Sequence, residues 1–513
     1  MTRNLLRFVT TFLVAIILLA CSAGGGETGT GFNDESVSVG VITAFGSVYV
    51  NGVKYETNNS TDVTIDGESA MESQLGVGML VTVRGKVNTD GVTGAASNII
   101  FEDDIEGLVF ANNITTDHSL NVMGQTVITD IDTVFESQVV AITRLEEIVE
   151  NNIVEVSGFT SGDGTIFASR VEVKRQLYNA GEPIEIKGMA SNVGGSEFNI
   201  GNLTIMYSDQ TTLRDFSGKQ FIDGMLVEVK SQQALDAQGK LIASSIELKD
   251  DIKNFALASQ AKEIEFEGIV TQQELSGQFS LNGREITITS STEFKGGDIA
   301  AIKVGVKIKM EGVLGIDGNI VAKELKFEQQ SKTKLEGVIT EINPNKQTIT
   351  VLGQEVYINN TTRVKDDLDE VSDSERRFFH FSNLRIGNFV EISAYLDTAT
   401  QQLTASKLER DDDEGESAEL EIKGIITSID LTRNIIVVSG VDIDISAINN
   451  FTGKLGNEIE AKGRLVANVW VASELSVEDG ENDEGKDNNS DDGNDEVKDK
   501  SNNDDGNEDD DND

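Results

Sequence analysis

The residues that most often carry out chemistry are scarce in this chain of 513 residues. It contains two histidines, His118 and His380, and one cysteine, Cys21. Neither histidine stands in a recognisable nucleophile or base motif, so the sequence indicates no Ser-His-Asp arrangement and no zinc site of the usual ligand composition. Asp and Glu are abundant, so a catalytic pair of carboxylates in one copy of a repeat stays open as an alternative. We expect a protein that is not an enzyme and has no resident metal or cofactor.

The charge of the chain limits its partners. The formal net charge is −46, with 88 Asp and Glu against 42 Lys and Arg. Such a surface repels phosphates and lacks a basic footprint, so we exclude nucleic acid as a partner. It allows only weak association with divalent cations. Residues 479–513 are mainly Asp, Asn, Glu and Gly and are predicted to form a disordered acidic tail.

The N-terminal residues have the form of a targeting signal. Arg3 and Arg7 precede the apolar run Phe8–Leu19, which is short for a membrane span. The run ends in Leu18-Leu19-Ala20-Cys21, which resembles the lipobox of bacterial lipoproteins. This resemblance implies cleavage after Ala20 and a lipid on Cys21, which would anchor the protein in a membrane. An ordinary secretory signal or an uncleaved anchor is the alternative.

The residue after Cys21 implies a location. Ser22 rather than Asp follows the cysteine, which in bacteria with two membranes implies transfer to the outer membrane. We therefore expect residues 1–20 to be a signal peptide and 21–36 a flexible tether.

Six copies of one pattern fill the rest of the chain. Each copy has an opening glycine, a hairpin glycine, and a closing motif of Ala, two mostly polar residues and an aliphatic residue. The opening glycines are Gly40, Gly107, Gly188, Gly268, Gly337 and Gly424. The hairpin glycines are Gly52, Gly124, Gly201, Gly283, Gly353 and Gly440. Five copies also have a glycine before the fourth strand, and the second copy has Asn151-Asn152 there, which is a mild change because Asn tolerates a left-handed backbone.

Each copy predicts five short strands, because period-two alternation of Val, Ile and Thr is interrupted by Gly, Asn and Asp turns. Five strands in so short a segment favour a small barrel similar to the OB class, with an open β-sandwich as the alternative. The predicted fold class is all-β, with six tandem modules. Their expected bounds are 37–103, 104–176, 183–250, 263–330, 333–412 and 419–478.

The fifth copy has an insertion, residues 365–384, in which Arg376 and Arg377 precede Phe378, Phe379 and Phe381. One interpretation is a helix or lid whose aromatic side chains pack on their own barrel. The other is a contact surface for a partner, since interfaces favour aromatic residues and Arg. OB barrels bind through their second and third strands. Phe279 and Tyr357 on those strands are expected to be core residues, and the lone Trp470 is expected to pack in the core or at its rim rather than to stack on a sugar.

This order of motifs behind a lipobox resembles the bacterial family catalogued as domain of unknown function 5666. The resemblance implies exported tandem β modules and supplies no catalytic residues. We expect a non-enzymatic binding or spacer protein of the cell envelope, whose partner is an envelope glycan or a surface protein. The alternatives are an envelope glycan hydrolase with an acidic pair in one module and a cation-responsive component of a surface layer.

Overall fold

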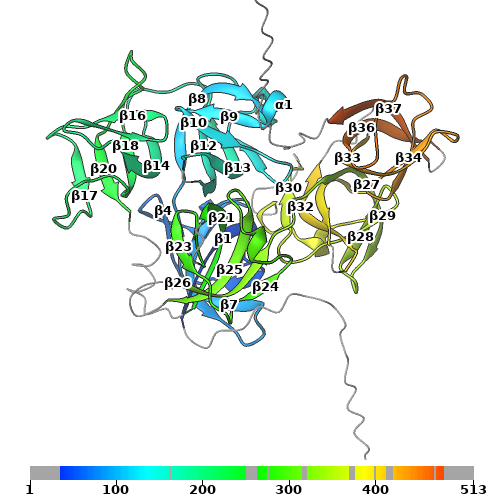
Figure 1. Cartoon of the computed structure of the whole chain (residues 1–513), viewed down its shortest axis with the longest axis horizontal. Coiled ribbons are helices and arrows are strands. Elements are labelled where there is room, and N and C mark those ends of the chain that lie inside the picture. Colours follow the sequence, from blue (N-terminus) through cyan, green and yellow to red (C-terminus); the bar gives the residue numbers. More distant parts are fainter. Residues whose placement is uncertain are drawn as a thin grey trace, which may run out of the picture.

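The computed structural model describes residues 35–161, 163–249, 263–273, 277–314, 320–368, 376–397, 400–411, 420–466 and 469–478. The signal peptide, Cys21, most of the tether, the acidic tail and residues 369–375 of the insertion lie outside the described residues. Strands and turns make up nearly all of the described chain, which confirms the predicted all-β fold (Figure 1). No helix within these ranges is long and apolar enough to cross a bilayer.

Barrels 1 to 3 follow one another along the chain. Barrel 1 contains β1 (Ser36–Ala44), β2 (Val48–Val50), β3 (Val53–Glu56), β4 (Asp62–Ile65), β5 (Glu68–Ala70), β6 (Leu80–Val87) and β7 (Thr93–Phe101). Barrel 2 contains β8 (Ile105–Asn113), α1 (Ile114–Asp117), β9 (Ser119–Val122), β10 (Gln125–Ile128), β11 (Val134–Ser137), β12 (Ile153–Thr160) and β13 (Ile166–Arg175). Barrel 3 contains β14 (Ile184–Ser191), β15 (Glu197–Ile200), β16 (Leu203–Met206), β17 (Thr212–Arg214), β18 (Leu226–Ser231), β19 (Leu241–Ile242) and β20 (Ser245–Leu248).

Barrels 4 to 6 repeat the same order. Barrel 4 contains β21 (Glu263–Gln273), β22 (Gln278–Leu281), β23 (Arg284–Thr287), β24 (Glu293–Lys295), β25 (Lys307–Leu314) and β26 (Ile320–Phe327). Barrel 5 contains β27 (Thr333–Asn343), β28 (Thr348–Val351), β29 (Gln354–Tyr357), β30 (Arg363–Asp366), β31 (Phe389–Leu396) and β32 (Leu403–Asp411). Barrel 6 contains β33 (Leu420–Asp430), β34 (Ile435–Val438), β35 (Val441–Asp444), β36 (Glu458–Val466) and β37 (Val469–Glu478). Single 3₁₀ turns occur at Glu72–Gln74, Leu145–Glu147, Ile299–Ala301 and Phe381–Asn383.

Barrel 4 shows how each ring closes. Its first strand β21 pairs with β22, β22 with β23, β23 with β26, β26 with β25, and β25 again with β21. Only the β23–β26 pair in this ring is parallel. The short strand β24 adds to β26 from outside the ring. A closed five-stranded ring of this kind is the small OB-like barrel predicted from the repeat.

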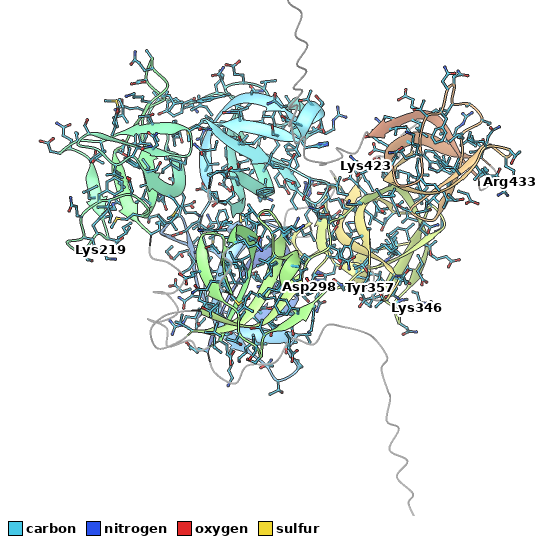
Figure 2. All side chains as sticks on the ribbon, in the orientation of Figure 1. Lys219, Asp298, Lys346, Tyr357, Lys423 and Arg433 are labelled. Atoms are coloured by element: carbon cyan, nitrogen blue, oxygen red, sulfur yellow. The ribbon has the colours of Figure 1, made fainter. Side chains whose placement is uncertain are left out.

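The barrel interiors are filled by the alternate apolar residues of these strands. In barrel 4, Phe266, Phe279 and Met310 are at most 1% exposed. Trp470 is likewise 1% exposed in barrel 6, so the predictions that Phe279 and Trp470 are core residues are confirmed. Tyr357 is only half-buried on β29 (Figure 2).

The opening glycine is required by a close approach inside each barrel. A Cβ on Gly188 would lie 2.4 Å from Cγ2 of Ile200, the residue just before the hairpin glycine Gly201. The same contact recurs in barrel 2, where a Cβ on Gly107 would lie 2.4 Å from Cε of Met123. The side chain at the hairpin therefore covers the first strand where a larger residue would collide with it.

The substitution of Asn for glycine in the second copy is also explained. Asn151 has φ +72°, and Gly305 at the matching position of barrel 4 has φ +87°. Both residues lie in the left-handed region, which Asn enters more readily than other non-glycine residues. The prediction that this change is mild is confirmed.

The barrels join in pairs through the edge of the first strand. Ser36–Val39 of β1 pair in parallel with Glu263–Phe266 of β21. Ile105 and Glu106 of β8 pair antiparallel with Ile186 and Glu185 of β14. Lys334 and Leu335 of β27 pair antiparallel with Lys423 and Ile422 of β33. In the described chain these pairings merge six barrels into three sheets of 13, 13 and 11 strands.

The pairing does not follow the order of the chain throughout. Barrels 2 and 3 pair as neighbours, and so do barrels 5 and 6, but barrel 1 pairs with barrel 4. Figure 1 shows the pair of barrels 1 and 4 at the lower centre, with the other two pairs above it and to its right. Val37 and Val39 of β1 are part of the apolar core of barrel 4. The six modules are therefore packed together and do not form an extended row.

We predict that Gly188→Ala destabilises the protein by about 1–3 kcal/mol, because it overpacks the contact with Ile200. Gly195→Ala in the same barrel is the matched control, since a Cβ there meets no atom within 4 Å. The control should stay within about 0.5 kcal/mol of the parent. Urea unfolding followed by circular dichroism measures both. Equal unfolding free energies for the two variants would contradict the close-packing argument.

Candidate functional site

A cavity of about 230 Å³ lies where barrels 1, 2, 4 and 5 meet. Its lining includes Thr43 of barrel 1, Phe159 of barrel 2, Lys307 of barrel 4 and Arg363 of barrel 5. These residues come from strands that are remote in sequence, so the cavity exists only because the barrels pack out of order. Its volume is near the lower end of small-molecule sites.

One wall of the cavity is apolar. Val41 of β1, Phe159 of β12 and Ile269 of β21 form a small core of their own between three barrels, and each is at most 4% exposed. Phe167 of β13 packs against this cluster and also lines the cavity. The wall therefore offers flat aromatic surface beside aliphatic surface.

A second wall, beside the apolar one, carries paired charges from barrel 4. The ammonium group of Lys307 lies 2.5 Å from Oε1 of Glu267 and 2.9 Å from Oε2 of Glu328. It also lies 5.0 Å from the centre of the Phe159 ring. Burial disfavours the charged ammonium, but the two glutamates outweigh it and raise the pKa of Lys307 above its usual value.

Two hydrogen bonds tie this charged wall to barrel 1. Glu267 accepts a hydrogen bond from the backbone N–H of Val41 at 3.2 Å. Lys309 donates to the carbonyl oxygen of Asn51 at 2.7 Å and pairs with Glu265 at 2.7 Å. The charges of the wall are thus fixed in position before any ligand arrives.

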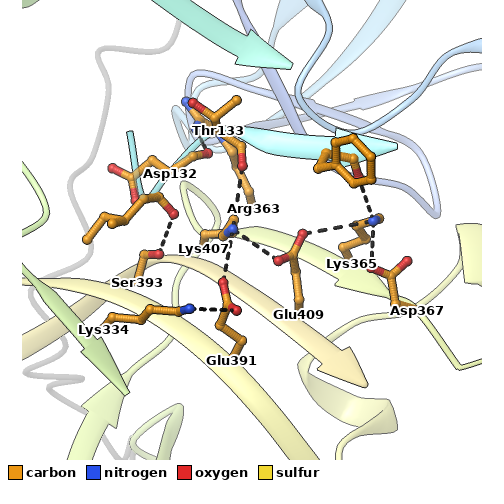
Figure 3. A network of polar contacts seen from close by, with 12 residues as sticks. Asp132, Thr133, Lys334, Arg363, Lys365, Asp367, Glu391, Ser393, Lys407 and Glu409 are labelled. Carbon is orange, nitrogen blue, oxygen red and sulfur yellow. Dashed lines mark hydrogen bonds and ion pairs between the residues drawn. The ribbon is translucent and has the colours of Figure 1, made fainter. Parts of the chain in front are cut away.

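The third wall is a polar network between barrels 2 and 5 (Figure 3). Side chains of β30 and β31 donate to backbone carbonyls between β10 and β11 and in β11: Ser393 to Ile131 at 2.5 Å, Lys365 to Phe135 at 2.8 Å, and Arg363 to Asp132. Ser406 also donates to the carboxylate of Asp132. Burial and the neighbouring Asp130 raise the pKa of Asp132, against the opposing charge of Arg363.

A second row of charges supports that network from within barrel 5. Lys407 lies 3.3 Å from Glu391 and 3.0 Å from Glu409, and Lys334 lies 3.1 Å from Glu391 (Figure 3). Desolvation disfavours the charged form of the half-buried Glu391, but the two lysines hold the pKa of Glu391 at about 2. Glu391 therefore stays ionised at neutral pH, and its ion pair with Lys407 links β31 to β32 behind the cavity wall.

The insertion of the fifth copy contacts barrel 1. The Arg377 guanidinium lies 3.6 Å from the centre of the Phe45 ring and donates to the carbonyl of Leu75 at 2.5 Å. The imidazole of His380 lies against Gly46, where a Cβ would come within 2.7 Å of it. Burial and the nearby charge of Lys54 hold the pKa of His380 below its usual value. The described part of the insertion therefore joins two barrels of the same chain.

The three aromatic residues predicted as a partner contact are placed differently from one another. Phe379 is 2% exposed in the core of barrel 5, which agrees with the interpretation that the aromatic residues pack on their own barrel and excludes Phe379 from a contact surface. Phe381 is partly buried against the same core, and Phe378 is 49% exposed. The insertion's first residues, Lys365 and Asp366, belong to strand β30. Cys21, the predicted lipidation site, lies outside the described residues.

Sequence reasoning missed the residues that build the cavity, although one signal was present. The closing motif has two polar positions, which in barrel 2 are Ser169 and Arg170 and in barrel 5 are Ser406 and Lys407. Ser169 donates to the carbonyl of Gly78 in barrel 1 at 2.7 Å, and Arg170 to Val77 at 3.0 Å. The polar residues that recur at these two positions of the closing motif indicated contacts between barrels.

Comparisons with known proteins concern the fold and the family. A solved structure described as "drosophila Unr CSD456" matches 44% of this chain and 95% of its own length at 14% identity, with a TM-score of 0.11, and carries no argument about function. A search of curated proteins gave no match.

A family model described as "Domain of unknown function (DUF5666)" matches residues 39–99, 106–172, 187–247, 267–326 and 336–409. These segments coincide with barrels 1 to 5. Barrel 6 has the same ring of five strands without a family match, and its residues 445–457 contain no short strand before β36. Since the matched segments cover more than half of the chain, this protein belongs to the family of the Domain of unknown function (DUF5666).

Proposed function

We propose that this protein is a lipid-anchored binding protein of the bacterial cell envelope, and that its ligand enters the cavity between barrels 1, 2, 4 and 5. The observation that carries the binding role is the lining of that cavity. Phe159 and Phe167 face a ligand together with ion-paired and hydroxyl side chains such as Lys307 and Thr43. Flat apolar surface beside fixed polar groups suits the two faces of a sugar ring. We therefore propose an envelope glycan as the ligand class.

The packing of the barrels supports binding over a spacer role. A spacer gains length from modules in a row, whereas here barrel 1 pairs with barrel 4 across two intervening barrels. One carboxylate at the cavity, Glu328, is held ionised. Desolvation disfavours its charged form, yet Lys307 outweighs that effect and holds the pKa of Glu328 below its usual value. A carboxylate held ionised in this way is a poor general acid for glycoside hydrolysis.

The anchor and location are proposed from the N-terminal sequence alone. Leu18-Leu19-Ala20-Cys21 supplies the lipobox and Ser22 the outer-membrane signal. A membrane anchor would place the barrels at the membrane surface, on one side of a flexible tether. From there they could hold a glycan of the envelope close to the membrane.

We predict that Cys21→Ala abolishes labelling by a radioactive fatty acid and leaves the precursor uncleaved, because the thiol is the lipid acceptor. Ser22→Asp is the matched control: it should keep the label but move the protein from the outer to the inner membrane fraction. Density-gradient fractionation and autoradiography measure both. A labelled, normally cleaved Cys21→Ala variant would refute the anchor.

We predict that Gln330→Trp blocks ligand entry, because Gln330 lines the cavity yet is exposed and so stands at its mouth. Gln238→Trp, at an exposed position of barrel 3, is the control for adding an indole to the surface. Binding to an array of envelope glycan fragments should fall at least about tenfold for the first variant, and stay at the parent level for the second. Thermal unfolding of both variants checks the fold. Undiminished glycan binding by folded Gln330→Trp would exclude the cavity as the site.

A further inference from the structure

A second junction, between barrels 1, 2 and 3, concentrates buried carboxylates. Asp66 comes from the turn after β4, Asp103 from the link between β7 and β8, and Glu185 from β14. One carboxylate oxygen of each lies within 4.8 Å of the other two. Asp103 is 4% exposed, Glu185 is 8% exposed, and Asp66 is half-buried.

Asp103 differs from its acidic neighbours because its carboxylate has no hydrogen-bond or ion-pair partner among the described residues. Asp66 accepts a hydrogen bond from the backbone N–H of Asp103 at 3.1 Å. Glu185 pairs through Oε2 with Lys230 at 2.8 Å. A buried carboxylate without a partner is costly, and the side chain is directed at two other carboxylates.

The nearby cations are engaged elsewhere. Lys187 donates to the backbone carbonyls of Glu102 at 3.0 Å and Asp103 at 2.8 Å, and pairs with Asp104 at 3.4 Å. Asp103 also lies within 4.8 Å of Glu106 and Glu155, but Arg175 pairs with Glu106 at 2.6 Å and Lys174 pairs with Glu155 at 2.9 Å. In the group with Asp66 and Glu185, Lys230 pairs with Glu185, and the carboxylate of Asp103 has no cation paired to it among the described residues.

We propose that Asp66, Asp103 and Glu185 bind one Ca²⁺ ion at the junction of barrels 1, 2 and 3. Ca²⁺ accepts carboxylate oxygens at about 2.3–2.6 Å, so two ligands on opposite sides of the ion are separated by roughly 4.6–5.2 Å. The spacing within 4.8 Å fits that span. Ca²⁺ tolerates irregular geometry better than Mg²⁺, which suits ligands supplied by two barrels and the link between β7 and β8. The half-buried Asp66 gives the ion a path from solvent.

Protons compete with the ion at this site. Burial and the charges of Asp66, Glu155 and Glu185 raise the pKa of Asp103 well above its usual value, with Lys187 opposing. Burial raises the pKa of Glu185 from 4.5 to about 7 despite Lys230, with Asp66 and Glu228 adding to the shift. Carboxyl groups with raised pKa values destabilise the folded protein as pH rises through those values, and bound Ca²⁺ offsets that loss. Because Ca²⁺ binds the deprotonated carboxylates, its stabilisation of the protein should fade on acidification.

The test compares the full chain with Asp103→Asn and Asp209→Asn by calorimetric titration with Ca²⁺ and by thermal unfolding in EDTA and in Ca²⁺. Asp209 is an exposed residue of barrel 3 outside the junction and serves as the control. The parent and Asp209→Asn should bind Ca²⁺ saturably and unfold at a higher temperature with it. Asp103→Asn should unfold above the parent in EDTA, because the buried charge is gone, and lose the response to Ca²⁺.

A response of Asp103→Asn equal to that of the parent, or a parent with no saturable response, would overturn the site. If Asp103→Asn does not fold, Asp66→Asn replaces it, since Asp66 is half-buried. It should weaken Ca²⁺ affinity by at least about tenfold while keeping the parent's circular dichroism spectrum. Unchanged affinity in that variant would also overturn the proposal.

Discussion

The structure depends on one constraint, which is that the first strand of every barrel has an edge its own barrel does not cover. In barrel 4, residues 263–269 of β21 pair with β25 on one side, while β22 begins to pair only at Val270. The backbone N–H and C=O groups on the other side of residues 263–266 therefore need partners, since a buried unpaired amide is costly. The matching edge of β1 supplies them. The same solution joins the other two pairs of barrels.

The choice of partners follows from the chain and creates the cavity. Barrels 2 and 3 lie next to each other in sequence, as do barrels 5 and 6. Within each of these pairs, the exposed edges of the two first strands pair with each other. Barrels 1 and 4 are left with free edges and pair with each other in parallel. The pair of barrels 1 and 4 then contacts barrel 2 through Phe159 and Ile269, and barrel 5 through the hydrogen bond of Thr43 to Asn360. The cavity therefore follows from the way in which the exposed edges of the first strands pair with one another.

Within a barrel, the sequence predicted the fold in some detail, because the relevant contacts are local. The hairpin at Asn282-Gly283 and the left-handed Asn151 each depend on residues a few positions away, and both were predictable. Contacts between barrels could not be predicted from the sequence. Arg363 and Asp132 are 231 positions apart, and nothing in either copy marks them as partners. The position of Phe379 stayed open between two interpretations for a related reason, since an inserted aromatic residue can pack inward or outward and only the space available in barrel 5 decides.

The high negative charge is organised by lysines that each hold two carboxylates. Lys230 lies between Glu185 and Glu228, Lys307 between Glu267 and Glu328, and Lys407 between Glu391 and Glu409. Further lysines join two of these groups, since Lys249 pairs with Glu228 at 2.6 Å and Lys334 pairs with Glu391 at 3.1 Å. These ion pairs offset the excess of carboxylates locally, and the edge pairing and the apolar contacts between barrels hold the barrels together. Acidic groups collect at the junctions because alternate residues of the paired first strands, such as Glu265 and Glu267, point away from the core and toward the neighbouring barrel. At Asp103 the same rule leaves a buried carboxylate that has no hydrogen bond or ion pair among the described residues.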